Sequence, residues 1–199
     1  VIEQGGLKVT TTLDLDLQEK AQTIVAEEIE KVEAQRITNG AAVILNPETG
    51  EILSMVGSKR FDDPDYDGQV NVTVALRQPG SSFKPFTYVT ALKEGYNAST
   101  MVMDVPTTFP GGEGMPDYNP VNYDGKYRGP VQLRYALGNS LNIPAVKLIA
   151  MVGIKDVLET AYDMGLTSLP PTKETLARVG LSLTLGGGEV RLLDLTGAY

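Results

Sequence analysis

The stretch "RQPGSSFKPF", residues 77–86, places a serine and a lysine three residues apart, between a Pro-Gly turn and an apolar run. Because Pro79 and Gly80 end a loop, Ser81 is expected at a helix N-terminus, where unpaired backbone N–H groups favour a developing anion. A spacing of three residues puts Lys84 on the same helix face, one turn on. Four apolar residues can bury this helix and desolvate the amine: Phe83, Phe86, Val89 and Leu92.

The composition restricts which residues can carry out chemistry at this segment. The 199 residues contain no histidine and no cysteine, which excludes a Ser-His-Asp triad, a thiolate nucleophile and a zinc-thiolate site. A buried lysine has a lowered pKa and, once neutral, accepts a proton from a serine hydroxyl. Lys84 is therefore a candidate general base for Ser81. On this segment alone, a serine N-cap followed by a solvated lysine explains the residues equally well.

The overall composition is that of a globular protein, with 42% hydrophobic and 21% charged residues. A net charge of −8 offers no basic stripe for phosphates, so nucleic acid is not an expected partner. No apolar run approaches the roughly 20 residues that span a bilayer. The sequence starts "VIEQGG" without Met and stops inside the apolar-periodic stretch "RLLDLTGAY". We therefore expect it to be a piece of a longer protein.

The hydrophobic periodicity predicts a mixed α+β fold. A strand is expected over residues 7–13, and a hairpin over 41–45 and 51–57 around the turn "NPETG". Helices are expected over residues 14–35, 82–94, 130–138, 143–151, 153–164 and 172–179, with a last apolar helix after the Gly-rich turn "LGGGE". The segment between the second and third of these helices, residues 96–129, is expected to be mostly loop. No third long strand follows the hairpin, which predicts an incomplete sheet.

The acidic loop "DDPDYDG", residues 62–68, has the spacing of aspartates that begins a calcium-binding EF-hand loop. Asp63, Asp65 and Asp67 fit the first ligand positions, but the closing glutamate position is occupied by Val74. We therefore expect an acidic surface loop and no metal site.

A second polar constellation lies in "LRYALGNSLNIPAV", residues 133–146, where Ser140 and Asn142 fall between two helical segments. The Ser140 hydroxyl can relay a proton to a leaving group, and the Asn142 amide can orient both a lysine and a substrate peptide bond. Ser-x-x-Lys followed about 60 residues later by Ser-x-Asn resembles the signature of penicillin-binding proteins and serine β-lactamases.

Longer segments extend this resemblance to nearly the whole chain. "RQPGSSFKPF", "NYDGKYRGPVQLRYALGNSLNIPAVKL" and "LGGGEVRLLDLTGAY" resemble the transpeptidase domain of class A (bifunctional) penicillin-binding proteins. "GGLKVTTTLDLDLQEKA" resembles the segment that joins the glycosyltransferase and transpeptidase domains in that class. The resemblance implies a linker over residues 1–40 and the N-terminal portion of a transpeptidase domain over 41–199. The implied fold is a helical subdomain with part of an antiparallel sheet.

The resemblance also implies a function and a role for each site residue. It implies a peptidoglycan D,D-transpeptidase on the outer side of the bacterial cytoplasmic membrane, in a membrane-anchored parent protein. Ser81 is then the nucleophile, Lys84 the general base, Ser140 the proton relay and Asn142 the residue that positions substrate and lysine. Stem peptides ending in D-Ala-D-Ala and β-lactam antibiotics are the implied partners, and no cofactor or metal is implied.

The sequence departs from the family at its third motif, Lys-Thr/Ser-Gly, which does not occur in these 199 residues. In the family its strand supplies one oxyanion-hole N–H and binds the substrate carboxylate, and loss of one such donor costs about 100- to 1000-fold in rate. This chain alone is therefore expected to be impaired unless another polypeptide supplies the segment. A D,D-carboxypeptidase or β-lactamase-type hydrolase, and a non-catalytic sensor of β-lactams or wall peptides, remain alternatives.

Overall fold

The computed structural model describes residues 5–63, 67–111 and 116–199, which form two compact units. The first unit extends to Leu76 and includes Arg191–Tyr199, and the second is Arg77–Val190. Helices and short antiparallel strands occur together in the chain, which confirms the α+β class. Asp65, one of the residues compared with a calcium loop, lies outside the described residues.

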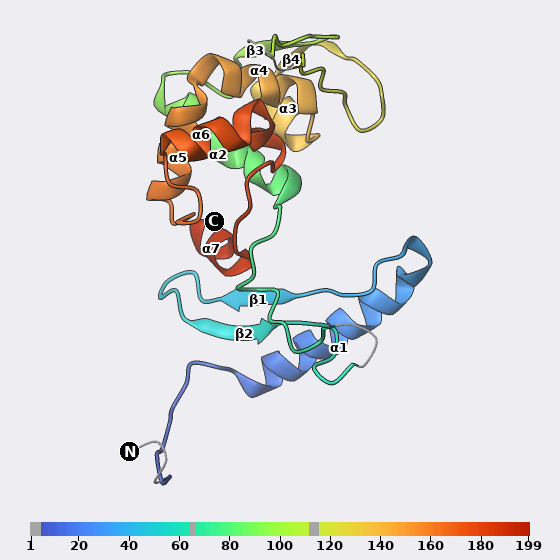
Figure 1. Ribbon diagram of the computed structural model, residues 1–199, viewed down its shortest axis with the longest axis vertical. Helices are drawn as coiled ribbons and strands as arrows, with labels where there is room; N and C mark the ends of the chain where they lie inside the picture. The colour runs from blue at the N-terminus through green and yellow to red at the C-terminus, as the bar shows by residue number, and fades with distance from the viewer. Residues whose placement is uncertain (1–4, 64–66, 112–115) are drawn as a thin grey trace. The chain divides into compact units, whose positions relative to one another are not determined.

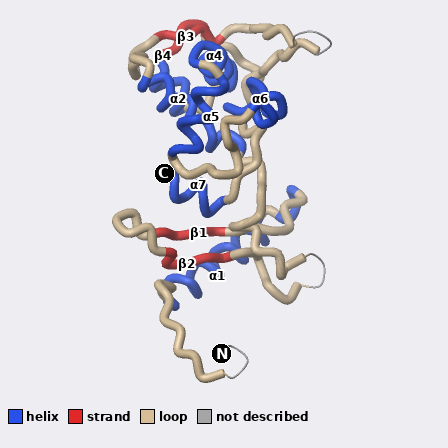
Figure 2. The backbone as a smooth tube through the Cα atoms, turned by 60° about the vertical axis from the view of Figure 1, so that its left-hand side comes forward, coloured by secondary structure: helices blue, strands red, loops and turns tan. Residues whose placement is uncertain are grey.

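The first unit is a two-stranded hairpin with a helix against each strand. β1 (Ala42–Leu45) pairs with β2 (Ile52–Val56) in antiparallel register, as predicted. α1 (Leu15–Lys31) contacts β2, whereas α7 (Leu192–Ala198) contacts β1, so the hairpin lies between them (Figure 1 and Figure 2). The Asp14 side chain caps α1 by accepting from the Leu17 N–H over 3.0 Å, a role for which aspartate is a preferred residue. The 3-10 helix η2 (Glu33–Gln35) follows α1.

The strand predicted over residues 7–13 is wrong. Thr12 Oγ1 donates to the carbonyl of Ile52 over 2.7 Å, and the Asp14 N–H donates to that of Leu53 over 2.9 Å. No ladder forms in the described part of the segment, whose side chains are exposed in both directions, with Val9 76% exposed. An alternating pattern stabilises a strand only when one of its faces is buried, and here neither is.

The second unit is a cluster of helices around α2 (Lys84–Lys93), which follows directly on the 3-10 helix η3 (Gly80–Phe83). α4 (Asn142–Val152) is apolar on most sides and is the most deeply buried element, as expected for a helix without a polar face. Three further helices confirm the predictions to within a few residues: α3 (Leu133–Gly138), α5 (Ile154–Asp163) and α6 (Lys173–Val179). The 3-10 helix η4 (Gly180–Leu185), which follows α6, was not predicted.

The four apolar residues expected to bury α2 differ in exposure, and Val89 is half-buried. Phe83 and Phe86 are 0% and 1% exposed, but Leu92 is 52% exposed. Leu92 lies in the last turn of α2, at a surface hollow that it lines together with Leu133 and Leu137.

Two short strands were not predicted: the first lies in the region expected to be mostly loop, and the second takes up residues 129–132, where the helix expected over 130–138 was to begin. β3 (Met101–Asp104) pairs with β4 (Gly129–Gln132), in register from Met101 with Gln132 to Asp104 with Gly129. Each strand has four residues, too few for an alternating pattern of apolar and polar residues to be recognised. More than 20 residues separate the two strands, so the sequence contains no short hairpin turn that would predict their pairing. Burial alternates along β3, which places Asp104 inside the unit with no exposed area.

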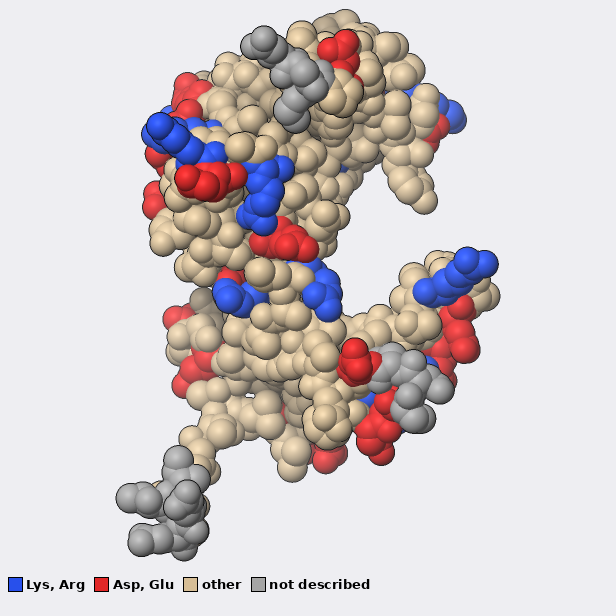
Figure 3. Space-filling view, viewed as in Figure 1, with Lys and Arg blue, Asp and Glu red and all other residues tan. Residues whose placement is uncertain are grey.

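Charged side chains lie mainly on the surface. The acidic residues of α1 are exposed, and Lys31 forms an ion pair with Glu28. The space-filling view shows acidic and basic side chains on the surface of the chain (Figure 3). Within residues 5–63, 67–111 and 116–199, none of the helices has the length and apolar character to cross a membrane.

Candidate active site

Ser81 lies in the 3-10 turn that leads into α2, and its side chain is exposed. The preceding Gly80 has a φ of +60°, which glycine adopts without strain and which turns the chain sharply before the serine. The neighbouring Ser82 hydroxyl donates back to the carbonyl of Pro79 over 2.6 Å. Among the described residues the Ser81 hydroxyl forms no hydrogen bond, so it is accessible to an approaching carbonyl group.

Lys84 is the first residue of α2 and is only 1% exposed. Its Nζ donates to the Ser140 carbonyl over 2.6 Å and to Asn142 Oδ1 over 2.8 Å, and it lies 3.0 Å from Ser140 Oγ. Three oxygen partners match the three donors of an ammonium group. When the amine is neutral, the Ser140 hydroxyl can instead donate to the nitrogen lone pair, so the same contact can carry a proton in either direction.

Burial shifts the titration of this lysine toward neutral pH. Removal of Lys84 from water lowers its pKa from 10.5 to about 8, because the charged form loses its hydration. At pH 7 about one lysine in ten is then neutral. The solvated lysine that the sequence left open is therefore excluded by the structure, and the amine has the protonation equilibrium of a usable base.

Ser140 adopts a strained backbone conformation. Its φ is +51°, in the left-handed region that non-glycine residues seldom occupy. This conformation allows both the carbonyl oxygen and the hydroxyl of one residue to contact Lys84 Nζ. Backbone strain of this kind is concentrated at functional sites, where the surrounding structure holds it in place. The sequence "GNS" gives no sign of it.

Asn142 is held by contacts on both sides. Its Oδ1 accepts from Lys84, while its Nδ2 donates to the Val121 carbonyl over 2.8 Å. Its backbone N–H, at the start of α4, donates to Asn122 Oδ1 over 2.8 Å. The amide that orients the lysine is therefore fixed by the loop before β4.

Two residues that the sequence analysis did not single out support this arrangement. The Asn122 Nδ2 lies 2.8 and 3.0 Å from the two carboxylate oxygens of Asp104, and also donates to the Lys126 carbonyl. Asn122 is 3% exposed and Asp104 is fully buried. The Arg128 N–H also donates to the Asp104 carboxylate, over 3.0 Å. Asn122 lies within the quoted segment "NYDGKYRGP", but Asp104 is more than 15 residues upstream, at the end of β3, and the two meet only in the folded chain.

The structure brings three of the four predicted site residues into direct contact: Lys84, Ser140 and Asn142. Ser81 lies one turn before Lys84, and no hydrogen bond joins its hydroxyl to the lysine amine. Such bonds are often long in enzymes without substrate and tighten when substrate binds. Among the described residues, no group of three or more His, Cys, Asp or Glu side chains could hold a metal ion.

Comparison with known proteins gives consistent matches over most of the chain. Residues 40–182 match the family model for the penicillin-binding protein transpeptidase domain. Penicillin-binding protein 1A of Rickettsia conorii is 34% identical over 186 residues, which cover 92% of this chain and 22% of the relative. Penicillin-binding protein 1B of Vibrio cholerae is 40% identical over 165 residues, 81% of this chain and 21% of the relative. The chain thus spans about a fifth of the length of these relatives.

The fold has a similar counterpart among solved structures. The PonA1 protein of Mycobacterium tuberculosis in complex with penicillin V superposes with a TM-score of 0.78 at 25% identity. The match covers 100% of this chain and 51% of that chain.

Proposed function

This chain belongs to the family of penicillin-binding protein transpeptidase domains, and on that premise we propose that it carries the Ser81 acylation site of a peptidoglycan D,D-transpeptidase. The observation that supports the proposal most is the burial of Lys84 against Ser140 and Asn142, one helical turn after an exposed serine. A lysine whose pKa is lowered to about 8 can take the role that histidine has in other serine enzymes.

In the proposed acylation step, Ser81 Oγ forms a bond to the carbonyl carbon of the penultimate D-alanine of a stem peptide. The hydroxyl proton passes to neutral Lys84 Nζ. The C–N bond to the terminal D-alanine then breaks, and the leaving nitrogen takes a proton from Lys84 through the Ser140 hydroxyl. D-alanine departs, and the peptide remains attached to Ser81 as an ester.

In the second step an amine from a neighbouring stem attacks this ester. Its nitrogen forms a bond to the carbonyl carbon and loses a proton toward Lys84, the ester C–O bond breaks, and Ser81 Oγ regains a proton. The product is an amide cross-link, and the site returns to its starting state. A β-lactam acylates Ser81 in the same way, but its ring nitrogen stays tethered after the C–N bond opens.

The proposal includes a larger protein around this chain. Residues 1–40 are proposed as a linker and 41–199 as the N-terminal portion of the transpeptidase domain, in a membrane-anchored polypeptide that works on the outer side of the cytoplasmic membrane. The Ser81 N–H is one proposed oxyanion donor. The second donor and the site for the substrate carboxylate come from a Lys-Thr/Ser-Gly strand, in the same polypeptide or a separate one. Without that strand the chain is impaired by about 100- to 1000-fold.

Two other functions remain to be separated from transfer. A hydrolase of the D,D-carboxypeptidase or β-lactamase type has the same nucleophile but uses water as acceptor, and a sensor is acylated without turnover. The exposure of Ser81 permits either acceptor, so product analysis must decide.

The test is turnover of a D-Ala-D-Ala peptide, with and without an added amino-acid acceptor, by a polypeptide that contains this chain and the Lys-Thr/Ser-Gly strand. Transpeptidation predicts D-alanine release with an amide product whose share grows with acceptor concentration. Release of free acid alone indicates a hydrolase. Acylation by penicillin without any peptide turnover indicates a sensor, and the transpeptidase proposal then fails.

A further inference from the structure

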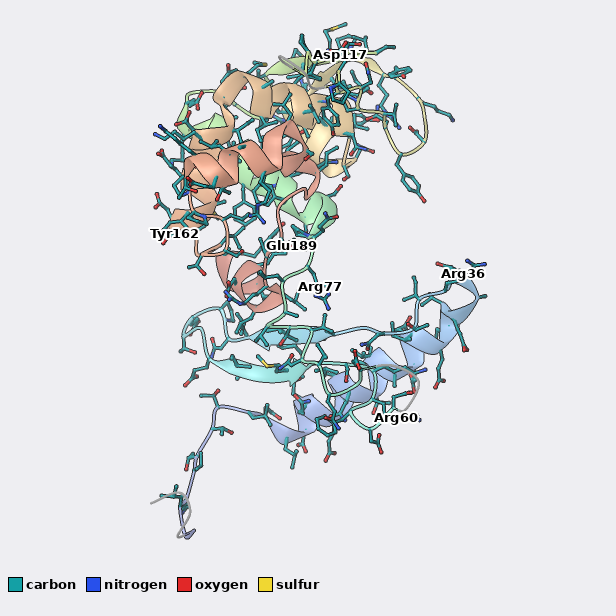
Figure 4. All side chains as sticks on the ribbon, in the orientation of Figure 1. Arg36, Arg60, Arg77, Asp117, Tyr162 and Glu189 are labelled. Atoms are coloured by element: carbon teal, nitrogen blue, oxygen red, sulfur yellow. The ribbon has the colours of Figure 1, made fainter. Side chains whose placement is uncertain are left out.

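The Gly-rich segment "LGGGE" lies against the chain that carries Ser81. Figure 1 shows the segment between α6 and α7 alongside the chain that enters α2. Thr184 and Thr87, both fully buried, form a hydrogen bond of 2.9 Å between their hydroxyls. At the C-terminal end of the Gly-rich segment, Arg77 and Val190 exchange two backbone hydrogen bonds of 2.9 Å. Arg77 and Glu189 are labelled there in Figure 4.

Gly186 lies between these two attachments and touches the nucleophile turn directly. A Cβ at Gly186 would come within 2.5 Å of the Gly80 Cα and 2.7 Å of the Gly80 oxygen, and into contact with the Gly80 nitrogen. Real Cβ atoms essentially never approach other atoms closer than 3.0 Å. The obstacle is backbone, which cannot rotate away as a side chain can. Only glycine at position 186 therefore permits the observed conformation of the residue before Ser81.

The other two glycines of the motif make different contacts. A Cβ at Gly187 would meet the Ser182 side chain, and one at Gly188 would meet Leu169. These contacts lie within the segment and the core, whereas that of Gly186 falls on the turn before the nucleophile.

We propose that Gly186 is a positioning residue for Ser81: its backbone packs on Gly80 and fixes the turn that presents the hydroxyl. The inference rests on the proposed function of Ser81 as nucleophile. Because the Ser81 hydroxyl forms no hydrogen bond among the described residues, its location is set by its own backbone. That backbone is held by the contact at Gly80 and by the attachments at Thr87 and Arg77. A misplacement of about 1 Å costs on the order of 100-fold in rate.

The test compares Gly186→Ala with Gly95→Ala in the full-length polypeptide that carries this chain. Gly95 has a φ of +94°, close to the +92° of Gly186, but a Cβ there meets nothing within 4 Å. Both variants therefore carry similar backbone strain, and only one presses on the nucleophile turn. The readouts are the first-order rate constant of acylation at saturating fluorescent penicillin and the fraction of protein acylated. The rate constant is independent of how much protein is folded, whereas the fraction is not.

Gly186→Ala is expected to lower the saturating rate constant about 100-fold, with the pH midpoint of acylation unchanged, while Gly95→Ala leaves the rate constant unchanged. A rate constant within twofold of wild type in Gly186→Ala, with only a smaller acylated fraction, overturns the proposal. An equal fall of the rate constant in both variants also overturns the proposal, because backbone strain alone would then explain the loss. A shifted pH midpoint assigns the effect to Lys84 and contradicts positioning of Ser81.

If Gly186→Ala does not fold, Thr184→Val decides, because it removes the Thr87–Thr184 hydrogen bond without adding bulk. A several-fold lower rate constant at full acylated fraction supports the proposal, and an unchanged rate constant overturns it. Wild-type acylation that is lost on Ser81→Ala establishes the proposed function separately. A wild-type protein that takes no penicillin overturns both inferences.

Discussion

The turn that carries Ser81 and the residues that surround the Lys84 amine belong to one site but are held by different contacts. The amine is fixed by side-chain hydrogen bonds to Ser140 and Asn142, which continue through Asn122 to the buried carboxylate of Asp104. We call these four residues the lysine cradle. The Ser81 turn is held by backbone packing and leaves its hydroxyl without a partner among the described residues.

The difference separates two requirements of the proposed chemistry. A base must be oriented and partly neutral before the reaction, and a network of satisfied hydrogen bonds in a buried site supplies both. A nucleophile must reach the substrate, so a hydroxyl tied to the protein would have to break a bond first. The contrast predicts that changes in the cradle alter the acylation rate through proton transfer, whereas changes around Ser81 alter it through position.

Among the variants of Lys84, the cradle and the turn beside Ser81, Lys84→Met is expected to lower the acylation rate most. The substitution keeps the aliphatic part of the side chain and removes the amine. Loss of the base predicts a fall in acylation rate of at least about 100-fold. The measurement is the rate of adduct formation with a fluorescent penicillin. Lys93→Met is the matched control, because Lys93 lies on the same helix and its amine donates to Thr160, which is not part of the cradle. An undiminished rate in Lys84→Met means that the base lies elsewhere.

A smaller effect is expected from Asn122→Ala, which cuts the cradle between Asp104 and Asn142. The buried carboxylate loses its amide donor, so the free energy of unfolding should fall by about 2–3 kcal/mol, and acylation should slow about tenfold as Asn142 loosens. Chemical denaturation and acylation kinetics measure the two effects. Asn119→Ala, whose exposed side chain bonds Thr108, should change stability by less than about 0.5 kcal/mol. If the two variants had the same free energy of unfolding, Asn122 would not stabilise the hydrogen-bond network of the cradle.

The pH dependence of acylation tests the base directly. Lys84 is active when neutral, and its pKa is lowered to about 8, so the rate should rise with pH and level off above that value. Between pH 7 and the plateau the expected rise is about tenfold, and below pH 7 the rate should fall about tenfold per pH unit. The midpoint is read from rates at saturating penicillin. A midpoint near the ordinary lysine value would show that the amine is not desolvated in solution.

The smallest effect is expected from Ser82→Ala. Its hydroxyl is already bonded to Pro79, unlike that of Ser81, so removal should cost the turn about 1 kcal/mol and leave the acylation rate within about threefold. Thermal unfolding and adduct kinetics check both values. A loss of acylation comparable to that of Lys84→Met would mean that the two neighbouring serines have been assigned in the wrong order.

The sequence predicted the helices and the site better than it predicted the short strands. The helical spacing of apolar residues is clear in α1 and α5, and the Ser-x-x-Lys and Ser-x-Asn motifs located Lys84 with two of its partners. β3 and β4 were missed because each is four residues long and they pair across more than 20 residues. The strand expected over residues 7–13 failed because alternation does not reveal whether a partner strand exists.

The missed parts of the site share a physical cause. Asp104 and Asn122 act through contacts between residues that are far apart in the chain, which no local pattern encodes. The positive φ of Ser140 and the close approach of Gly186 to Gly80 are properties of the folded backbone. A serine after "GN" and a glycine in a Gly-rich turn are both common in sequences without such a role.

The most direct test of the account is intact-mass spectrometry after incubation with penicillin, on this 199-residue chain and on a longer polypeptide with the Lys-Thr/Ser-Gly strand, each as wild type and as Ser81→Ala. The account predicts one penicillin adduct on the longer wild-type protein, slow or no adduct on the shorter chain, and none on either Ser81→Ala variant. An adduct on the shorter chain at the same rate would show that the motifs present here suffice. An adduct that persists after Ser81→Ala would contradict the assignment of the nucleophile.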